Sequence, residues 1–420
     1  MKQDRPIVPD RMHKDWYFVT VGFFAWLRHR NVNVRFKFYN RSKHIVLGKC
    51  IDIGRLREEI AHVAKMEHTD EDIQWYWDNY GEDKLNGFLT MEYLNWLRTS
   101  KLSPIDIEKI HTPSGTSFSI EPHGLWMEAM DWETFILPII TYLYGEWVLK
   151  EHGFTREQAH AEAMFRHGML VERLRPYPDL RIGSFGLRRQ FDYELSRKID
   201  EVTIREIPNQ LAGISCVGLA KQLGQRTIGT FPHLGPMIYA GICEDTDEAI
   251  RASHMQFFDD WADTFPEKYR TAVIDTFGSD SFFQDFGPER IKRWPRFKID
   301  SGNPFHESDK IEAWLKSYGV NPRTKVVNPT DGLNGDLMIA LHLALRHRFE
   351  SMLPGIGTNW TNNTGLPTYG SFVVKADEAN GRKLVKLSNN LDKASGDPAM
   401  VARMKRIHGY TNTERAELIV

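Results

Sequence analysis

The stretch RFKIDSGNP, residues 296–304, decides how this chain is interpreted. A short apolar run ends abruptly at Asp300 and Ser301, and a glycine, an asparagine and a proline follow. The same ending, in which a strand-like run stops at polar side chains before a helical pattern, recurs several times after residue 200. Alternation of short strands with amphipathic helices predicts repeated βα units, and therefore a parallel sheet or barrel.

Polar groups stand at the carboxyl ends of the other predicted strands as well. They are Ser215 after LAGI, His233 after RTIGTFP, Asp275 after RTAVI, Asp331 after KVVNPT, and Gly357 with Thr358 after PGI. In a (β/α) barrel all these ends lie on one rim, which is where such barrels build their active sites. The pattern favours an α/β fold with an irregular, incomplete (β/α) barrel over an open sheet, with a site on that rim.

Residues 1–150 predict a separate α+β domain. The alternating run NVNVRFKFYN predicts a half-buried strand, and WETFILPIITYLYGEWVL predicts a buried helix. Near the other end of the chain a hairpin is predicted, with its turn at Asn380–Gly381. We therefore expect an N-terminal α+β domain over residues 1–150, on which the C-terminal tail of residues 360–420 packs, and a catalytic barrel over residues 151–359.

The composition excludes several classes of protein. Hydrophobic residues at 41% and charged residues at 26% are typical of a globular protein, and a net charge of −2 favours neither nucleic acid nor a membrane as partner. The three cysteines lack the spacing of a zinc site or a disulfide framework, so we expect no metal site and a reducing compartment. No run has the length of an export signal or a membrane span, so a cytoplasmic protein is expected.

Two motifs predict binding of a phosphorylated, aromatic ligand. The glycine-rich PGIGT ends a strand, and its backbone N–H groups suit a phosphate. Arg188 and Arg189 stand close to Phe185, which is typical of cations that bind phosphate or carboxylate beside a ring that stacks on a planar base. Carboxylates on the same rim suit ribose hydroxyls.

The same carboxylates leave a second chemistry open. Asp275, Asp300 and Asp331 are also the residue types from which a barrel hydrolase draws its acid and its base. The chain has no G-x-S-x-G elbow and no G-x-x-x-x-G-K-[S/T] phosphate loop, so these two chemistries are excluded.

A series of motifs, in order along most of the chain, resembles the nicotinate phosphoribosyltransferases, the type II enzymes of NAD salvage. The motifs are DWYFVTV (15–21), SFGLRRQ (184–190), IGTFPH (228–233), VIDTFGSD (273–280), KIDSGNP (298–304), TDGLN (330–334), GIGTNW (355–360) and VKLSNN (385–390). The resemblance implies an N-terminal domain on an irregular α/β barrel, and a homodimer with active sites at its interface. That family joins nicotinate to phosphoribosyl pyrophosphate, giving nicotinate mononucleotide and pyrophosphate, with ATP hydrolysis coupled through a phosphohistidine.

The resemblance also implies roles for single residues. His233 matches the phosphorylated histidine, Asp275 the carboxylate that orients it, and Asp300 the group beside the reacting ribose. Tyr17, reaching in from the partner subunit, and Phe185 would stack on the two faces of the pyridine ring, and Arg188 and Arg189 would bind phosphates or the nicotinate carboxylate. Asp331 would bind ribose hydroxyls, and Gly357 and Thr358 the 5′-phosphate. The other expected substrate-binding positions are Ser215, Lys298, Ser301, Gly332 and Gly355. Mg²⁺ is expected to arrive with phosphoribosyl pyrophosphate or ATP, and ATP to act as a co-substrate.

The chain departs from the family pattern at several positions. They are Ser184, Leu187, Gln190, Ile214, Cys216, Pro232, Leu234, Gly235, Lys298 and Asn303. Because several of them surround His233 or the base pocket, a phosphoribosyltransferase that uses nicotinamide or another pyridine base without ATP coupling stays open. The barrel hydrolase and a non-catalytic nucleotide-binding paralogue are the alternatives from other classes.

Overall fold

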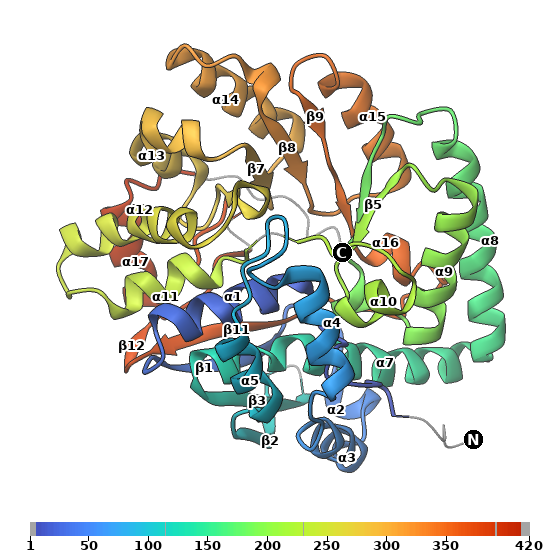
Figure 1. Ribbon diagram of the computed structural model, residues 1–420. Coiled ribbons are helices and arrows are strands. Elements are labelled where there is room, and N and C mark those ends of the chain that lie inside the picture. The colour runs from blue at the N-terminus through green and yellow to red at the C-terminus, as the bar shows by residue number, and fades with distance from the viewer. Residues whose placement is uncertain (1–5, 114, 230, 391–392, 413–420) are drawn as a thin grey trace.

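The computed structural model describes residues 6–113, 115–229, 231–390 and 393–412. Parallel strands with their helices form one half of the molecule, at the top of Figure 1, and an antiparallel sheet with its own helices forms the other half. No helix among these residues has the length and apolarity needed to cross a membrane.

The antiparallel sheet has five strands in the order β12-β11-β1-β3-β2. The strands are β1 (Asn33–Asn40), β2 (Ile105–Thr112), β3 (Gly115–Leu125), β11 (Phe372–Ala379) and β12 (Arg382–Lys383). Alternate side chains of β1 are buried, as predicted. Asn380 and Gly381 have φ of 44° and 85°, the positive values that a two-residue hairpin turn of this kind requires, so the predicted hairpin is confirmed.

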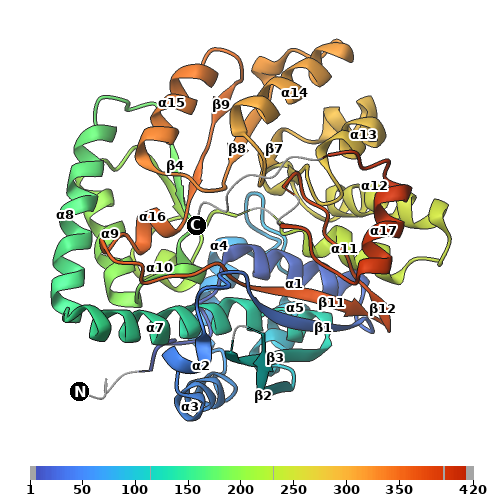
Figure 2. The same cartoon turned by 180° about the vertical axis from the view of Figure 1, so that it is seen from behind.

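The tail of the chain returns to the N-terminal sheet through β11. This strand pairs antiparallel with β1 along most of its length, and Figure 2 shows the two lying side by side. The last helix, α17 (Pro398–Ile407), packs instead on α12 (Asp247–Thr264) of the other half. The tail therefore contacts both halves, and the domain boundaries at residues 150 and 359 stay a prediction.

The helices from the N-terminal part of the chain cover the antiparallel sheet and approach the parallel strands. They are α1 (Trp16–Arg28), α2 (Leu47–Cys50), α3 (Ile53–Val63), α4 (Asp70–Tyr80), α5 (Met91–Thr99), α6 (Trp126–Ala129) and α7 (Trp132–His152). The helix predicted from WETFILPIITYLYGEWVL is α7, and most of its side chains are buried because it runs between the two halves.

The parallel strands form two short sheets, not one closed ring. The orders are β10-β4-β5 and β6-β7-β8-β9, with bounds β4 (Ile182–Ser184), β5 (Leu211–Ile214), β6 (Thr271–Val273), β7 (Arg296–Ile299), β8 (Val326–Pro329), β9 (Ser351–Met352) and β10 (Gly355–Ile356). The helices around them are α8 (Arg156–Leu174), α9 (Tyr193–Glu206), α10 (Val217–Gln222), α13 (Ser279–Arg293), α14 (Pro304–Ser317), α15 (Gly335–Leu345) and α16 (Thr358–Thr361). A further helix, α11 (Leu234–Ile242), packs between α12 and the strand β11 of the antiparallel sheet. The predicted irregular, incomplete barrel is confirmed.

One predicted strand is wrong. The run RTIGTF contributes a single bridge between Ile214 and Thr227 and otherwise has no strand structure among its described residues. The segment packs against helix α1. Gly229 lies so close to this helix that a Cβ on Gly229 would be 3.3 Å from the backbone N of Tyr17. The segment packs on a helix where a barrel strand would have its partner, and this leaves a gap between the two sheets. Thr230 in the same motif lies outside the described residues.

Candidate active site

A cavity of about 180 Å³ lies at the carboxyl ends of the parallel strands. Its walls come from three parts of the chain: the segment after β4, the ends of β7, β8 and β10, and the β11 region of the tail. The predicted site residues that line it are Phe185, Arg188, Arg189, His233, Lys298, Asp300, Asp331, Gly332, Gly355, Gly357 and Thr358. The rim predicted from the sequence is thus assembled in one place.

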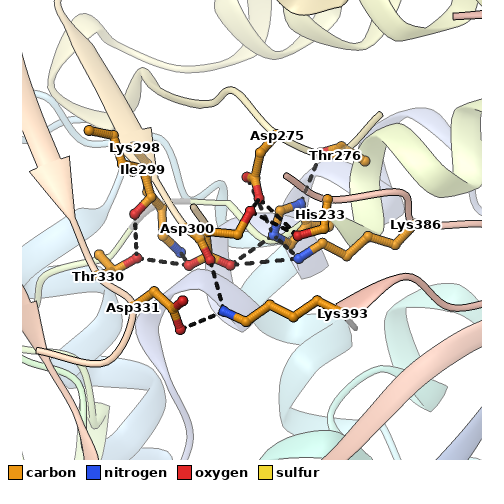
Figure 3. A network of polar contacts seen from close by, with 12 residues as sticks. His233, Asp275, Thr276, Lys298, Ile299, Asp300, Thr330, Asp331, Lys386 and Lys393 are labelled. Atoms are coloured by element: carbon orange, nitrogen blue, oxygen red, sulfur yellow. Dashed lines mark hydrogen bonds and ion pairs between the residues drawn. The ribbon is translucent and has the colours of Figure 1, made fainter. Parts of the chain in front are cut away.

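His233 stands at the centre of this site, and both of its ring nitrogens have partners (Figure 3). Nδ1 lies 3.0 Å from Thr276 Oγ1. Nε2 lies 2.8 Å from Asp300 Oδ2 and also 2.8 Å from Lys386 Nζ. Burial, and then the charge of Lys386, lower the pKa of His233 to about 4, so the ring is neutral at pH 7.

Asp300 is held ionised by the cations around it. Lys298 Nζ lies 3.0 Å from Oδ1, and Lys386 Nζ lies 3.9 Å from Oδ2. Burial acts to raise its pKa, but Lys298 and the contact with His233 outweigh burial and hold the pKa well below the usual value. A carboxylate fixed in this way offers permanent negative charge to anything that enters the cavity.

Asp275 and Ser301 lie beneath the cavity and do not line it. The Ser301 hydroxyl donates to Asp275 Oδ2, and the backbone N–H of Asn389 donates to Ser301 Oγ at 3.0 Å. Asp275 Oδ1 is 3.9 Å from His233 Nε2, so the carboxylate in hydrogen-bond contact with the histidine is Asp300 and not Asp275. The other oxygen, Asp275 Oδ2, joins the strand ends to the tail of the chain through the hydroxyls of Ser301 and Ser388.

Phe185 rests on two paired glycines. Gly183 and Gly355 face each other in the β4–β10 pair, and a Cβ on either would lie within 2.8 Å of the Phe185 ring. Only glycine leaves room for an aromatic ring to lie flat on this strand pair.

The two neighbouring arginines have different environments. The Arg188 guanidinium contacts two carboxylates, Asp15 at 3.2 Å and Glu133 at 2.9 Å. Arg189 has no ion pair with any described residue, and burial together with Arg188 lowers its pKa to about 10. Arg189 is therefore the guanidinium that is free to receive an anionic ligand.

Tyr17 and Ser215 lie behind the wall of the cavity. The Ser215 hydroxyl donates to Asp15 Oδ1 at 2.7 Å, and Asp15 in turn contacts Arg188. The Arg188 guanidinium also lies 5.5 Å from the centroid of the Tyr17 ring. The N-terminus of α1 is thereby attached to the carboxyl end of β5 within a single chain.

Four cations of the site were missed at the level of sequence. Arg41, Lys375, Lys386 and Lys393 line the cavity, and all four come from the β1 and β11 region or the tail that follows it. Lys393 Nζ lies 2.5 Å from Asp331 Oδ1 and donates to the backbone carbonyl of Asp300 at 3.2 Å, as Figure 3 shows. The one available signal was the run of lysines in VVKADEANGRKLVKL, which alternation alone assigns to solvent.

The arrangement suits binding of a multiply charged anion more than acid–base hydrolysis. Seven cations line the cavity, including Arg188, Arg189 and Lys298, against the two carboxylates Asp300 and Asp331. Asp275 is fully buried, so the three carboxylates that a hydrolase would share do not face one space.

Comparison with known proteins agrees with this geometry. Residues 180–412 match the model of the nicotinate phosphoribosyltransferase (NAPRTase) family, and residues 12–141 match the model of its N-terminal domain. The fold is similar to that of nicotinate phosphoribosyltransferase from Vibrio cholerae, with a TM-score of 0.84 at 22% identity over 97% of this chain and 95% of that one. It is also similar to the structures described as this enzyme from Saccharomyces cerevisiae (TM-score 0.82, 25% identity, 97% and 100% covered) and Porphyromonas gingivalis (0.83, 21%, 95% and 99%). Because the family model spans more than half of the residues, the chain belongs to the nicotinate phosphoribosyltransferase family.

Proposed function

We propose that this protein condenses nicotinate with phosphoribosyl pyrophosphate to form nicotinate mononucleotide and pyrophosphate, in NAD biosynthesis or salvage. The observation that carries the proposal is the cavity itself, in which a ring platform, an ionised carboxylate and seven cations meet. Each of these groups fits one part of the two substrates.

The reacting carbon of the ribose lies, in this proposal, beside Asp300. Glycosyl transfer develops positive charge on the ribose ring, and a fixed carboxylate stabilises that charge as it appears. The leaving diphosphate goes to the lysines of the tail, and Mg²⁺ enters with it as part of the substrate. The pyridine ring lies on Phe185, and the 5′-phosphate lies at Gly357 and Thr358.

The nicotinate carboxylate has a natural partner in Arg189, which forms no ion pair with a described residue although Asp331 and Asp300 lie near enough to act on its charge. Nicotinamide would leave that cation without an anion, and this favours nicotinate over nicotinamide as the base.

ATP coupling through His233 is the finer part of the proposal. In the neutral tautomer with the proton on Nδ1, donated to Thr276 Oγ1, Nε2 keeps the lone pair. Once Nε2 gives up its contact with Asp300, it attacks the γ-phosphorus of ATP, so that an N–P bond forms at Nε2 and ADP leaves. Nε2 is the nitrogen directed at Asp300 and Lys386, and the Lys386 cation is placed to stabilise the phosphoryl group.

The test is a discontinuous assay with phosphoribosyl pyrophosphate and magnesium, with nicotinate or nicotinamide, each with and without ATP, and with the mononucleotide detected by mass. We expect nicotinate mononucleotide, formed faster with ATP, and we expect His233→Ala to lose the ATP-dependent part of the rate. His123→Ala, on the antiparallel sheet, is the matched control. Product formed with nicotinamide but not with nicotinate would contradict the base assignment. ATP stimulation that persists in His233→Ala would contradict the phosphohistidine.

A second test concerns the ring platform. In Gly355→Ala the new Cβ would meet Phe185 Cδ2 at 2.8 Å and Thr330 Cγ2 at 3.1 Å, so the ring must move. Since base–aromatic stacking contributes about 1–3 kcal/mol, we expect KM for the base to rise roughly tenfold in steady-state kinetics. Gly168→Ala on α8, where a Cβ meets nothing within 4 Å, is the control, and equal KM values for the two variants would remove Phe185 from the base site.

The homodimer with interface sites stays a prediction. Tyr17 lies beside Arg188 of the same chain, behind the cavity wall, so its proposed place on the second face of the pyridine ring depends on the partner subunit. Sedimentation equilibrium of the active protein decides the point.

A further inference from the structure

Asp200 on α9 is a buried carboxyl that the proposed reaction does not use. Its side chain is 1% exposed, and no ion pair joins it to a described residue. Oδ1 accepts a hydrogen bond from Trp360 Nε1 at 2.9 Å, and Oδ2 accepts one from Ser184 Oγ at 3.4 Å. A carboxyl in an apolar interior is costly unless both oxygens have partners, and here both partners are neutral donors.

The two donors belong to two different walls of the cavity. Ser184 is the last residue of β4 and precedes Phe185, the platform for the ring. Trp360 belongs to α16, the short helix that begins at Thr358 in the phosphate loop. Asp200 is therefore one hydrogen bond away from each of the two subsites.

We propose that Asp200 is a positioning residue, which ties the ring-stacking end of β4 to the phosphate-loop helix α16 and so fixes the distance between the base and the 5′-phosphate subsites. The inference deepens the proposed function and rests on it, since it takes Phe185 as the base site and Thr358 as the phosphate site. Asparagine in place of Asp200 keeps an acceptor for Trp360, and its N–H₂ group can donate to Ser184 Oγ, so it preserves both hydrogen bonds with one direction reversed, whereas leucine removes both.

The binding test separates a fixed distance from simple structural support. Calorimetry would measure the binding affinity of three ligands: nicotinate mononucleotide, nicotinate alone and ribose 5-phosphate alone. Each ligand would be titrated into wild type, Asp200→Asn, Asp200→Leu and Trp360→Phe. If the distance is what Asp200 sets, Asp200→Leu and Trp360→Phe lose roughly tenfold in affinity for the mononucleotide and less than about twofold for either half, because each half needs only one wall, while Asp200→Asn stays close to wild type. Trp314→Phe is the control, since it also removes a buried indole donor, bonded to the Phe283 carbonyl at 3.0 Å, outside the cavity.

A spectroscopic readout tests the tie without any ligand. Burial raises the pKa of Asp200 to about 7, so its ionisation falls in an accessible range. In protein labelled with 5-fluorotryptophan, the Trp360 resonance, assigned from Trp360→Phe, should shift with pH with a midpoint near 7 in wild type and stay constant in Asp200→Asn. A Trp360 resonance that is the same in wild type and in Asp200→Leu at every pH would overturn the tie.

The outcomes distinguish the two proposals. A wild-type protein that neither forms nor binds nicotinate mononucleotide overturns the proposed function. The positioning role alone is overturned if the wild-type protein does both but the variants lose affinity for the mononucleotide and for its two halves by the same factor. It is also overturned if the variants lose affinity for none of these ligands. Trp360→Phe keeps the test decisive if Asp200→Leu does not fold, because it deletes one hydrogen bond and little volume.

Discussion

Asp300→Asn is expected to lower kcat by at least about 100-fold while leaving the fold intact. The substitution keeps the shape of the side chain but removes the charge that Lys298 and Lys386 hold in place. The asparagine amide can still accept from Thr330 Oγ1, now 2.8 Å from Oδ1, so the local hydrogen bonding survives. What is lost, in the proposed reaction, is the negative charge that faces the ribose when its ring becomes positive.

The measurement is kcat at saturating nicotinate and phosphoribosyl pyrophosphate, with circular dichroism to verify the fold. Asp280→Asn makes the same carboxylate-to-amide change on α13, where the side chain pairs with Lys310 at 3.2 Å, and it should leave kcat unchanged. A kcat for Asp300→Asn within about threefold of wild type would remove Asp300 from the reaction.

The second large effect is a loss of stability in acid that originates in buried neutral histidines. Burial lowers the pKa of His13 to about 3, and burial is also the first cause that lowers the pKa values of His167, His233 and His408 to about 4. In the unfolded chain each of these rings binds a proton near pH 6.5, while the folded protein binds it only near pH 3–4. Their contribution to stability is therefore complete above pH 6.5 and is lost as the pH falls towards 4.

His408→Gln isolates one of these contributions. Asp200, with its pKa raised by burial, acts in the opposite sense over part of the same range, so the difference between variant and wild type is more informative than the total slope. At about 1.4 kcal/mol per pH unit, the destabilisation caused by His408→Gln should be smaller at pH 4.5 than at pH 7 by about 2–3 kcal/mol. Urea unfolding at both pH values measures it, with the part-exposed His123→Gln as control. An equal cost at the two pH values would contradict a neutral, buried His408.

The sequence predicted the strand ends of this site better than it predicted their partners. Asp300 follows a strand with a clear apolar pattern, so its place on the rim was evident from local order. Asp275 follows an equally clear strand, yet it lies beneath the cavity. Its partner Ser301 is bonded to Asn389 of the tail, a segment far away in the sequence, and this contact helps decide which carboxylate meets His233. Local patterns carry no information on such distant contacts.

The lysines of the tail were not predictable for the same reason. Lys375 alternates with buried valines in β11 and belongs, by pattern, to a solvent-facing side. That side faces the cavity because β11 pairs with β1, and the contact between Asn33 and Asn380 joins residues 347 apart in the sequence. The segment RTIGTF does not form the expected strand for a similar reason, because α1 occupies the place where a neighbouring barrel strand would pair with it.

The pairing of β11 with β1 also affects when a newly made chain becomes able to work. A ribosome releases the strands and helices up to residue 359 well before it releases Lys375, Lys386 and Lys393, and domains generally begin to fold in the order of synthesis. Until the tail arrives, β1 has an open edge, and Asp300 lacks one of the cations that keep it ionised. If the lysines of the tail hold the diphosphate as proposed, a nascent chain halted before residue 372 should be unable to retain phosphoribosyl pyrophosphate.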